Sequence, residues 1–211
     1  MTRILLVTSL VALLPAALPA QQATFAVVRG SDTVASESFA PDSAGLSGIL
    51  VRGMAAARER ISYQITLIEG LTPLIELAAW RGDDPEGVKA RQNVRVIFKG
   101  DSVAVDEAND KSGVSTRLFE TQPNAVPYLN LSCRFLELAT RRAAGKDSVA
   151  VPFFNLNGGQ TISGTVKRID RDSVTLDLGR IQFRLRVDPG GMILGGSVPS
   201  QGLTIVRGGG S

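Results

Sequence analysis

The 211-residue sequence contains no histidine and a single cysteine. Without histidine, the Ser-His-Asp and Cys-His arrangements and histidine acid–base catalysis are excluded. Carboxylates and one thiol are then the only conventional side-chain metal ligands, which argues against catalytic zinc. The lone Cys133 can form no internal disulfide. Its place on an apolar helical face favours a buried, unreactive thiol, since a nucleophilic thiol would need a neighbouring base.

Aromatic residues are also scarce, at 5% of the chain, and no strongly basic stretch compensates for them. The 23 Lys and Arg are interspersed with 20 Asp and Glu, for a formal net charge of +3. Nucleic-acid-binding proteins usually carry a basic stripe and aromatic stacking platforms, so we predict no nucleic-acid partner. No apolar run reaches transmembrane length, so we also predict no membrane span. The few aromatics argue further against an outer-membrane barrel, which needs aromatic girdles.

The first residues follow the order of a secretory signal. Arg3 precedes a short apolar run over 4–14, followed by small and helix-breaking residues and then polar Gln21. We expect cleavage near Ala20, and no lipid anchor because the only cysteine lies far downstream. The predicted location is periplasmic or secreted. The predicted organisation is a signal peptide over 1–20, a single antiparallel β domain with an inserted helix over 21–207, and a flexible Gly/Ser tail over 208–211.

Alternation of apolar and polar residues with a period of two recurs along the chain. Between 181 and 187, for example, Ile181, Phe183 and Leu185 alternate with polar residues. This alternation predicts strands with one buried and one solvated face, separated by turns rich in Gly, Asp and Pro. The predicted strands span 24–29, 33–39, 46–51, 60–68, 74–80, 93–99, 102–106, 114–120, 148–156, 161–169, 173–178, 181–187, 192–194 and 203–206.

One segment changes its period. From 127 to 143 the polar residues Asn130, Arg134, Glu137 and Arg141 fall on one narrow helical stripe, and the other residues are mostly apolar. This pattern predicts one amphipathic α-helix over about 127–143, pressed deeply into a core or sheet, with Glu137 and Arg141 as an i,i+4 ion pair. The predicted fold class is mainly β: an antiparallel meander curling into a half-barrel or lipocalin-like barrel, with this helix packed against it.

This order of elements resembles that of exported bacterial β-proteins of uncharacterised function. The residues that carry the resemblance are the stretch TQPNAVPY at 121–128 and the stretch VDPGGMILGG at 187–196. More distantly, the layout is similar to the periplasmic lipoprotein-carrier superfamily. That resemblance implies an incomplete barrel curled around helices that shelters acyl chains, and it carries over no functional residue.

Motifs that would identify a reaction are absent from the sequence. It has no P-loop, no Rossmann glycine fingerprint and no G-x-S-x-G elbow. Glycoside hydrolysis needs two suitably separated carboxylates, and no pair stands out. The acidic loops at 83–86 and 106–110 fit solvated loops better than calcium sites. We therefore predict a protein that is not an enzyme and needs no cofactor or metal.

Three functions stay open. The first is a binding protein whose curved sheet and helix enclose an apolar cleft for a lipid or another hydrophobic ligand. The second is an envelope structural or protein-interaction module with a filled core and envelope proteins as partners, and the third is a carboxylate-based hydrolase. A cavity of roughly several hundred Å3 would favour the first, and a solid core the second. Any single cleft candidate also fits ordinary core packing; these candidates are Trp80, Phe98, Tyr128, Phe135, Phe153 and Phe183.

Overall fold

The computed structural model describes residues 23–40, 45–54, 57–109 and 113–209, so the predicted signal peptide lies outside the described residues. In this part of the chain one 15-stranded sheet has the order β8-β7-β6-β5-β4-β3-β2-β1-β15-β14-β13-β12-β11-β10-β9. Neighbouring strands are antiparallel, apart from the parallel pair β9 and β10. The elements are β1 Ala23–Arg29, β2 Asp32–Ala40, β3 Gly45–Arg52, β4 Glu59–Ile68, β5 Leu71–Arg81, β6 Gln92–Lys99, β7 Ser102–Asn109, β8 Gly113–Glu120, β9 Val126–Tyr128, α1 Cys133–Arg142, β10 Ser148–Asn155, β11 Thr161–Asp170, β12 Ser173–Leu178, β13 Ile181–Val187, β14 Ile193–Val198, the 3-10 helix η2 Pro199–Gln201 and β15 Leu203–Gly208.

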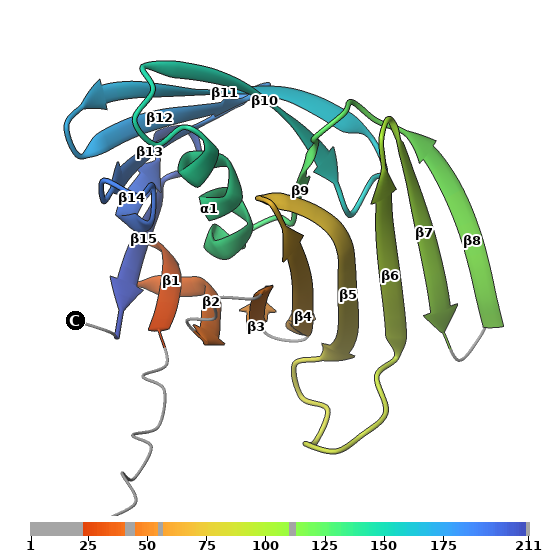
Figure 1. Ribbon diagram of the computed structural model, residues 1–211. Helices are drawn as coiled ribbons and strands as arrows, with labels where there is room; N and C mark the ends of the chain where they lie inside the picture. The colour runs from red at the N-terminus through yellow and green to blue at the C-terminus, as the bar shows by residue number, and fades with distance from the viewer. Residues whose placement is uncertain (1–22, 41–44, 55–56, 110–112, 210–211) are drawn as a thin grey trace, which may run out of the picture.

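The sheet curls around α1 (Figure 1). Strands β10–β13 pass over one side of the helix and β1–β5 lie on the other (Figure 1). The end strands β8 and β9 are not neighbours in the sheet, so the curl is an incomplete barrel. Side chains bring its two ends together: the rings of Phe98 and Phe119 pack edge-on against Phe154 of β10, with centroids 5.6 and 5.8 Å away. The predicted class, a mainly antiparallel β fold with one helix, is confirmed.

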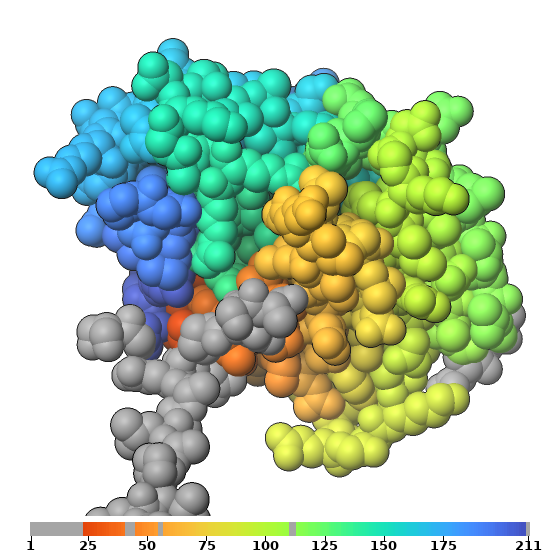
Figure 2. All heavy atoms as spheres, viewed as in Figure 1, coloured from red at the N-terminus to blue at the C-terminus, as the bar shows by residue number. Residues whose placement is uncertain are grey.

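The period-two alternation explains which face of each strand is buried. The apolar residues on the inner face form one continuous core with α1, and Leu50, Ile65 and Ile75 within it are fully buried. Figure 2 shows the green atoms of α1 filling the space between the blue C-terminal strands and the orange strands β4 and β5. Among the described residues, no helix is long and apolar enough to cross a membrane.

The helix starts later than the sequence pattern predicts. Residues 126–128 form the short strand β9 on β10, where Pro127 occupies a sheet edge that does not need its missing N–H. Leu131 then takes a left-handed conformation, with φ at 68°. Ser132 is the N-cap, and its hydroxyl accepts a hydrogen bond from the Phe135 N–H at 3.4 Å. The predicted start at 127 is therefore wrong, because a left-handed residue separates β9 from α1.

Gly191 shows how closely the turn before β14 approaches α1. Its φ is +82°, and a Cβ there would lie 2.4 Å from the carbonyl oxygen of Thr140. We expect Gly191→Ala to lower the free energy of unfolding by about 1–3 kcal/mol, because the alanine is strained and its methyl group meets backbone. Urea denaturation measures the loss. The control is Gly190→Ala, since its Cβ would meet nothing closer than 3.4 Å; equal losses in the two variants would contradict this explanation.

Candidate functional site

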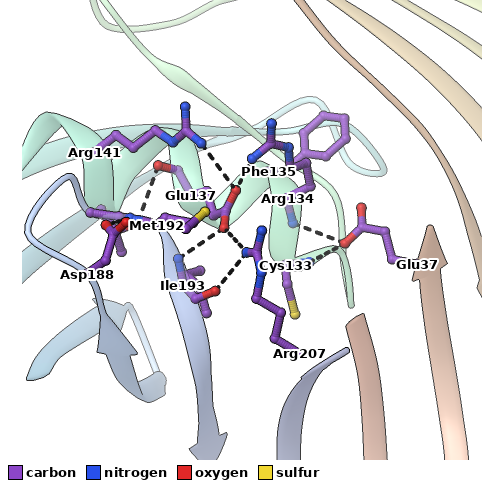
Figure 3. Close-up of polar contacts among 12 residues, drawn as sticks. Glu37, Cys133, Arg134, Phe135, Glu137, Arg141, Asp188, Met192, Ile193 and Arg207 are labelled. Carbon is purple, nitrogen blue, oxygen red and sulfur yellow. Dashed lines mark hydrogen bonds and ion pairs between the residues drawn. The ribbon is translucent and has the colours of Figure 1, made fainter. Parts of the chain in front are cut away.

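The middle of the polar stripe of α1 is buried against the sheet. Arg134 is 3% exposed and Glu137 is 0% exposed. Figure 3 shows Glu137 pointing at Ile193 of β14 and Arg207 of β15, while Glu37 of β2 faces the backbone of Cys133 and Arg134. A charged side chain stays ionised in a core only when it is paired and hydrogen-bonded. The partners of Arg134 and Glu137 therefore show how these charges are stabilised.

Glu137 is the centre of this cluster. Its Oε1 accepts a hydrogen bond from the Ile193 N–H at 3.0 Å and another from Nη1 of Arg207 at 2.8 Å. Its Oε2 pairs with Nη1 of Arg134 and lies 3.8 Å from Nη2 of Arg141. The predicted pair with Arg141 is therefore present but is the longest of the three ion pairs. Through Arg207 and Ile193, this one carboxylate ties α1 to β15 and β14.

Two phenylalanine rings cover the buried Arg134 and the partly buried Arg207. The guanidinium carbon of Arg134 lies 4.8 Å from the centroid of Phe39. The guanidinium carbon of Arg207 lies 4.9 Å from Phe25 and 5.3 Å from Phe39. Cation–π attraction strengthens when the groups are desolvated, as here. The rings therefore help to hold both arginines in position beside Glu137.

A second buried carboxylate, Glu37 of β2, faces the first turn of α1. Its Oε1 lies 2.5 Å from the Ser132 hydroxyl, and its Oε2 accepts hydrogen bonds from the N–H groups of Cys133 at 2.9 Å and Arg134 at 3.0 Å. These bonds satisfy helix N–H groups that lack partners within the helix. Burial raises the pKa of Glu37, although the hydrogen bonds from Ser132 and from the helix N–H groups oppose the shift.

This cluster fixes the helix and does not form an active site. Glu37 and Glu137 are 2% and 0% exposed, so a substrate has no access to either carboxylate. Cys133 is buried as predicted, and burial followed by the charges of Glu37 and Glu137 holds its thiol pKa well above the usual value. A thiol that stays protonated is a poor nucleophile.

The accessible candidate site is the mouth of the barrel at the N-terminal end of α1. A depression of about 530 Å3 opens there. Its wall combines apolar side chains with four side-chain amides and one arginine. The lining residues come from strands, turns and η2 that are far apart in the sequence: Arg29, Val34, Gly53, Met54, Tyr128, Asn130, Leu131, Asn155, Asn157, Ile162, Ile181, Gln201 and Leu203.

A small inner cavity of about 20 Å3 lies next to this mouth, reaching Leu136 of α1 and Phe183 of β13. Leu131 and Ile181 line both spaces. Leu131 holds the left-handed conformation, which costs a bulky residue on the order of 1–3 kcal/mol. Backbone strain of this kind is common at functional sites. Leu131, which lines both spaces, is therefore a candidate functional residue.

The structure brings five of the six predicted cleft residues into one core. Phe98 packs on Phe154, Phe135 lies 5.2 Å from Tyr63, and Phe153 lies 6.5 Å from Tyr128 between ring centroids. Only two of the six, Tyr128 and Phe183, line the spaces at the mouth, and Tyr128 alone reaches the larger one. No large enclosed cleft lies between them, because α1 occupies the interior within the part of the chain described here.

Trp80 is separate from this group. Its cross-strand partner is Arg60, next to the inward-facing pair Ile61 and Ala79, so it lies on the outer face. Its indole N–H donates to the Val88 carbonyl at 2.8 Å, and the Arg60 guanidinium carbon lies 5.0 Å from its ring centroid. Trp80 therefore holds the loop between β5 and β6 and does not face the mouth.

A groove of about 660 Å3 crosses strands β2–β8. Its lining includes charged side chains of both signs beside serine, glutamine, asparagine and small apolar ones, whereas the charged residue that lines the mouth is Arg29. Arg95 lies opposite Glu76 on one side and Asp106 on the other in the cross-strand register. Such a surface suits a large polar partner better than a small apolar ligand.

Comparisons with known proteins support the fold. No family model matches the chain, and no curated protein matches it. A DUF1089 family protein from Pseudomonas aeruginosa is similar over 81% of this chain and 92% of its own, with a TM-score of 0.54 and 10% identity. A β-barrel-like protein of domain of unknown function DUF1849 from Brucella abortus is similar over 90% of this chain and 95% of its own, with a TM-score of 0.51 and 8% identity. At these identities the likeness shows a shared fold, which agrees with the predicted resemblance to uncharacterised β-proteins.

Proposed function

We propose that the protein is a non-enzymatic binding protein that takes an amphipathic lipid-like ligand, such as a fatty acid, at the barrel mouth. The observation that carries the proposal is the depression of about 530 Å3, whose apolar wall is interrupted by a few polar groups. Ligand sites commonly have volumes of about 300–1,000 Å3 with this kind of lining, and the mouths of β-barrels are among their usual places.

The lining suggests how such a ligand would lie. Ile162, Ile181 and Leu203 offer an apolar surface to a hydrocarbon chain, and the amides of Asn155 and Asn157 offer hydrogen bonds to a head group. Arg29 adds a positive charge at the same depression, which favours an anionic head group. Contact with the apolar part removes hydrocarbon surface from water, and the polar head keeps its hydrogen bonds.

Binding without catalysis is supported by the residues that the chain offers for chemistry. The sequence has no histidine, and the only thiol is buried with a raised pKa. Glu37 and Glu137 are committed to hydrogen bonds with α1, β14 and β15. The signal-like first 20 residues support action in the periplasm or outside the cell.

Titration with dansyl-undecanoic acid, followed by its fluorescence, tests the proposal. We expect saturable binding by the wild-type chain and binding about tenfold weaker or worse in Ile181→Glu, because the variant places a charge in the apolar wall that contacts the hydrocarbon chain. The matched control is Ile169→Glu, since Ile169 is 56% exposed and belongs to neither space at the mouth. Absence of saturable binding, or equal weakening in both variants, would overturn the proposal.

Leu131→Gly gives an expectation of opposite sign. Glycine adopts φ near 68° without strain, and loss of the leucine side chain enlarges the mouth and the inner cavity, both of which Leu131 lines. We therefore expect Leu131→Gly to bind the same probe more tightly than wild type. Unchanged or weaker binding would show that Leu131 does not limit the site.

A second candidate function, a protein-interaction module, is favoured by the filled interior and the polar groove over β2–β8. In that case the chain binds no fatty-acid probe, and substitutions in the groove abolish capture of its partner. Arg95→Glu is the substitution of choice, because it reverses the charge between Glu76 and Asp106.

A further inference from the structure

Strand β8 forms one end of the sheet and has neither a proline nor a bulge to protect its edge. It runs for 8 residues, and Gly113–Leu118 are all exposed. Figure 1 shows it at the outer margin of the molecule, beside β7. Natural edge strands are usually shortened, bulged, or interrupted by proline or charges that block pairing. The register of β8 with β7 is regular over its whole length, and the strand contains no proline.

Large apolar side chains accompany this free edge. Val114 is 76% exposed and Leu118 is 78% exposed, the two highest values among the large exposed hydrophobic residues of the described chain. They lie four residues apart and therefore share one face of the strand. The only basic residue of β8, Arg117, lies on the opposite face and pairs with Glu107 at 3.2 Å.

The phase of the hydrogen bonds shows which backbone groups are available. The Thr121 N–H donates to the Asp101 carbonyl at 2.7 Å, just beyond the end of the register in which Ser102 lies opposite Glu120. In an antiparallel pair such bonding recurs at every second residue. Odd-numbered residues of β8 therefore face β7, and Val114, Thr116 and Leu118 turn their N–H and C=O groups toward the free edge.

We propose that β8 pairs with β8 of a second copy of this chain, antiparallel and centred on Thr116. In this register Val114 of each copy lies opposite Leu118 of the other, and the outward backbone groups of Val114, Thr116 and Leu118 meet one another. Each opposed pair then exchanges two N–H···O bonds, about six in total. The apolar side chains that are most exposed in one copy cover each other across the twofold axis.

Side-chain charge and apolar pairing favour this register over the registers centred one residue earlier or later. Centring the pair on Arg117 would place two arginines directly opposite, which is destabilising. Centring it on Ser115 would place Val114 opposite a threonine and leave Leu118 without an apolar partner. With Thr116 at the centre, Arg117 lies opposite Ser115 of the second copy and keeps its pairing with Glu107.

The dimer goes beyond the proposed ligand site and is independent of it, because no residue that lines the mouth belongs to β6, β7 or β8. A single strand pair is a small interface compared with the roughly 2,000–5,000 Å2 buried in permanent complexes. We therefore expect a dimer that forms with rising concentration and dissociates on dilution.

Cysteine cross-linking of the whole chain tests both the dimer and its register. In a hydrogen-bonded pair Thr116→Cys places its Cα about 5.5 Å from its symmetry mate, within the range of a disulfide. Ser115→Cys is the matched control, because its nearest symmetry mate is a diagonal neighbour about 7–8 Å away. We expect a disulfide-linked dimer from Thr116→Cys and little from Ser115→Cys; native Cys133 is buried and does not interfere.

Sedimentation equilibrium gives an independent measure with the native backbone. Leu118→Lys is expected to weaken dimerisation about tenfold or more, and Ile169→Lys, at another exposed apolar residue, to leave it unchanged. A wild-type chain that stays monomeric at all concentrations, cross-linking as strong through Ser115→Cys, or equal effects of the two lysines would overturn the proposal. A monomer that still binds the fatty-acid probe would overturn the dimer alone.

Discussion

Glu137→Ala is expected to lower the free energy of unfolding by about 3–5 kcal/mol, because removing one member of a buried ion cluster leaves its partners charged and unpaired. Arg134 and Arg207 both lose the carboxylate they bind, and the Ile193 N–H loses its acceptor. Equilibrium urea denaturation measures this loss. The cost comes mainly from the arginines left behind, since a buried ion pair in itself contributes little net stability.

Two variants separate this cause from a general sensitivity of the helix. Glu137→Gln keeps an oxygen for the Ile193 N–H but removes the charge, so we expect a smaller loss than for alanine. Arg141→Ala removes a partner that is 42% exposed and 3.8 Å from the carboxylate, so we expect a change of no more than about 1 kcal/mol. If Arg141→Ala proves as damaging as Glu137→Ala, the account of the cluster is wrong.

Glu37→Ala is expected to lower the free energy of unfolding by about 3 kcal/mol, because each unsatisfied buried donor costs about 1–3 kcal/mol. The N–H groups of Cys133 and Arg134 and the hydroxyl of Ser132 lose their partner. Glu37→Gln should restore most of this stability. Its amide oxygen accepts from the two N–H groups, and its NH2 donates to the Ser132 oxygen.

The same residue gives a dependence on pH. Since burial raises the pKa of folded Glu37, its contribution to stability is fully present below the unfolded pKa of about 4.3 and is lost as pH rises through the folded pKa. The free energy of unfolding of wild type minus that of Glu37→Gln should therefore fall as pH rises from about 4. Urea denaturation of both chains over this pH range measures the difference, and a difference that grows with pH would contradict the raised pKa.

Much of the fold could be predicted because alternation is a local signal. The alternation predicts most strands close to their observed bounds, but β14 runs from Ile193 to Val198 where only 192–194 is predicted, and β9 is not predicted. β9 has three residues, all buried, which is too short to show a period. β15 continues to Gly208, one residue into the predicted tail, and residues 210–211 lie outside the described chain.

The buried polar contacts that Glu37 and Arg207 make with α1 are harder to predict from the sequence. A narrow polar stripe predicts a deeply buried helix, but the two central residues of the stripe, Arg134 and Glu137, are themselves buried against the sheet. One signal was available: Glu37 shares the inward phase of Ala35 and Phe39, and Arg207 shares that of Leu203 and Ile205. Charged residues at inward positions of two strands indicate buried partners of opposite charge, here Arg134 and Glu137 on the helix.

The residues that line the mouth show no recognisable pattern in the sequence. These residues come from seven strands, η2 and three turns, and each fits an ordinary place in its own segment. Aromatic residues were the expected lining, yet they pack into the core because α1 fills the barrel. Amides such as Asn155 and Gln201 line the opening instead. Only the closure of the sheet around the helix brings these residues together.

Photoaffinity labelling with a diazirine fatty acid, followed by peptide mapping of the whole chain, tests the proposed ligand site most directly. We predict that the label is concentrated on peptides that contain Tyr128–Leu131, Asn155–Ile162, Ile181 and Gln201–Leu203, and that unlabelled fatty acid competes it away. Label confined to the groove over β2–β8, or spread without competition, would show that the barrel mouth is not where this protein binds a lipid-like ligand.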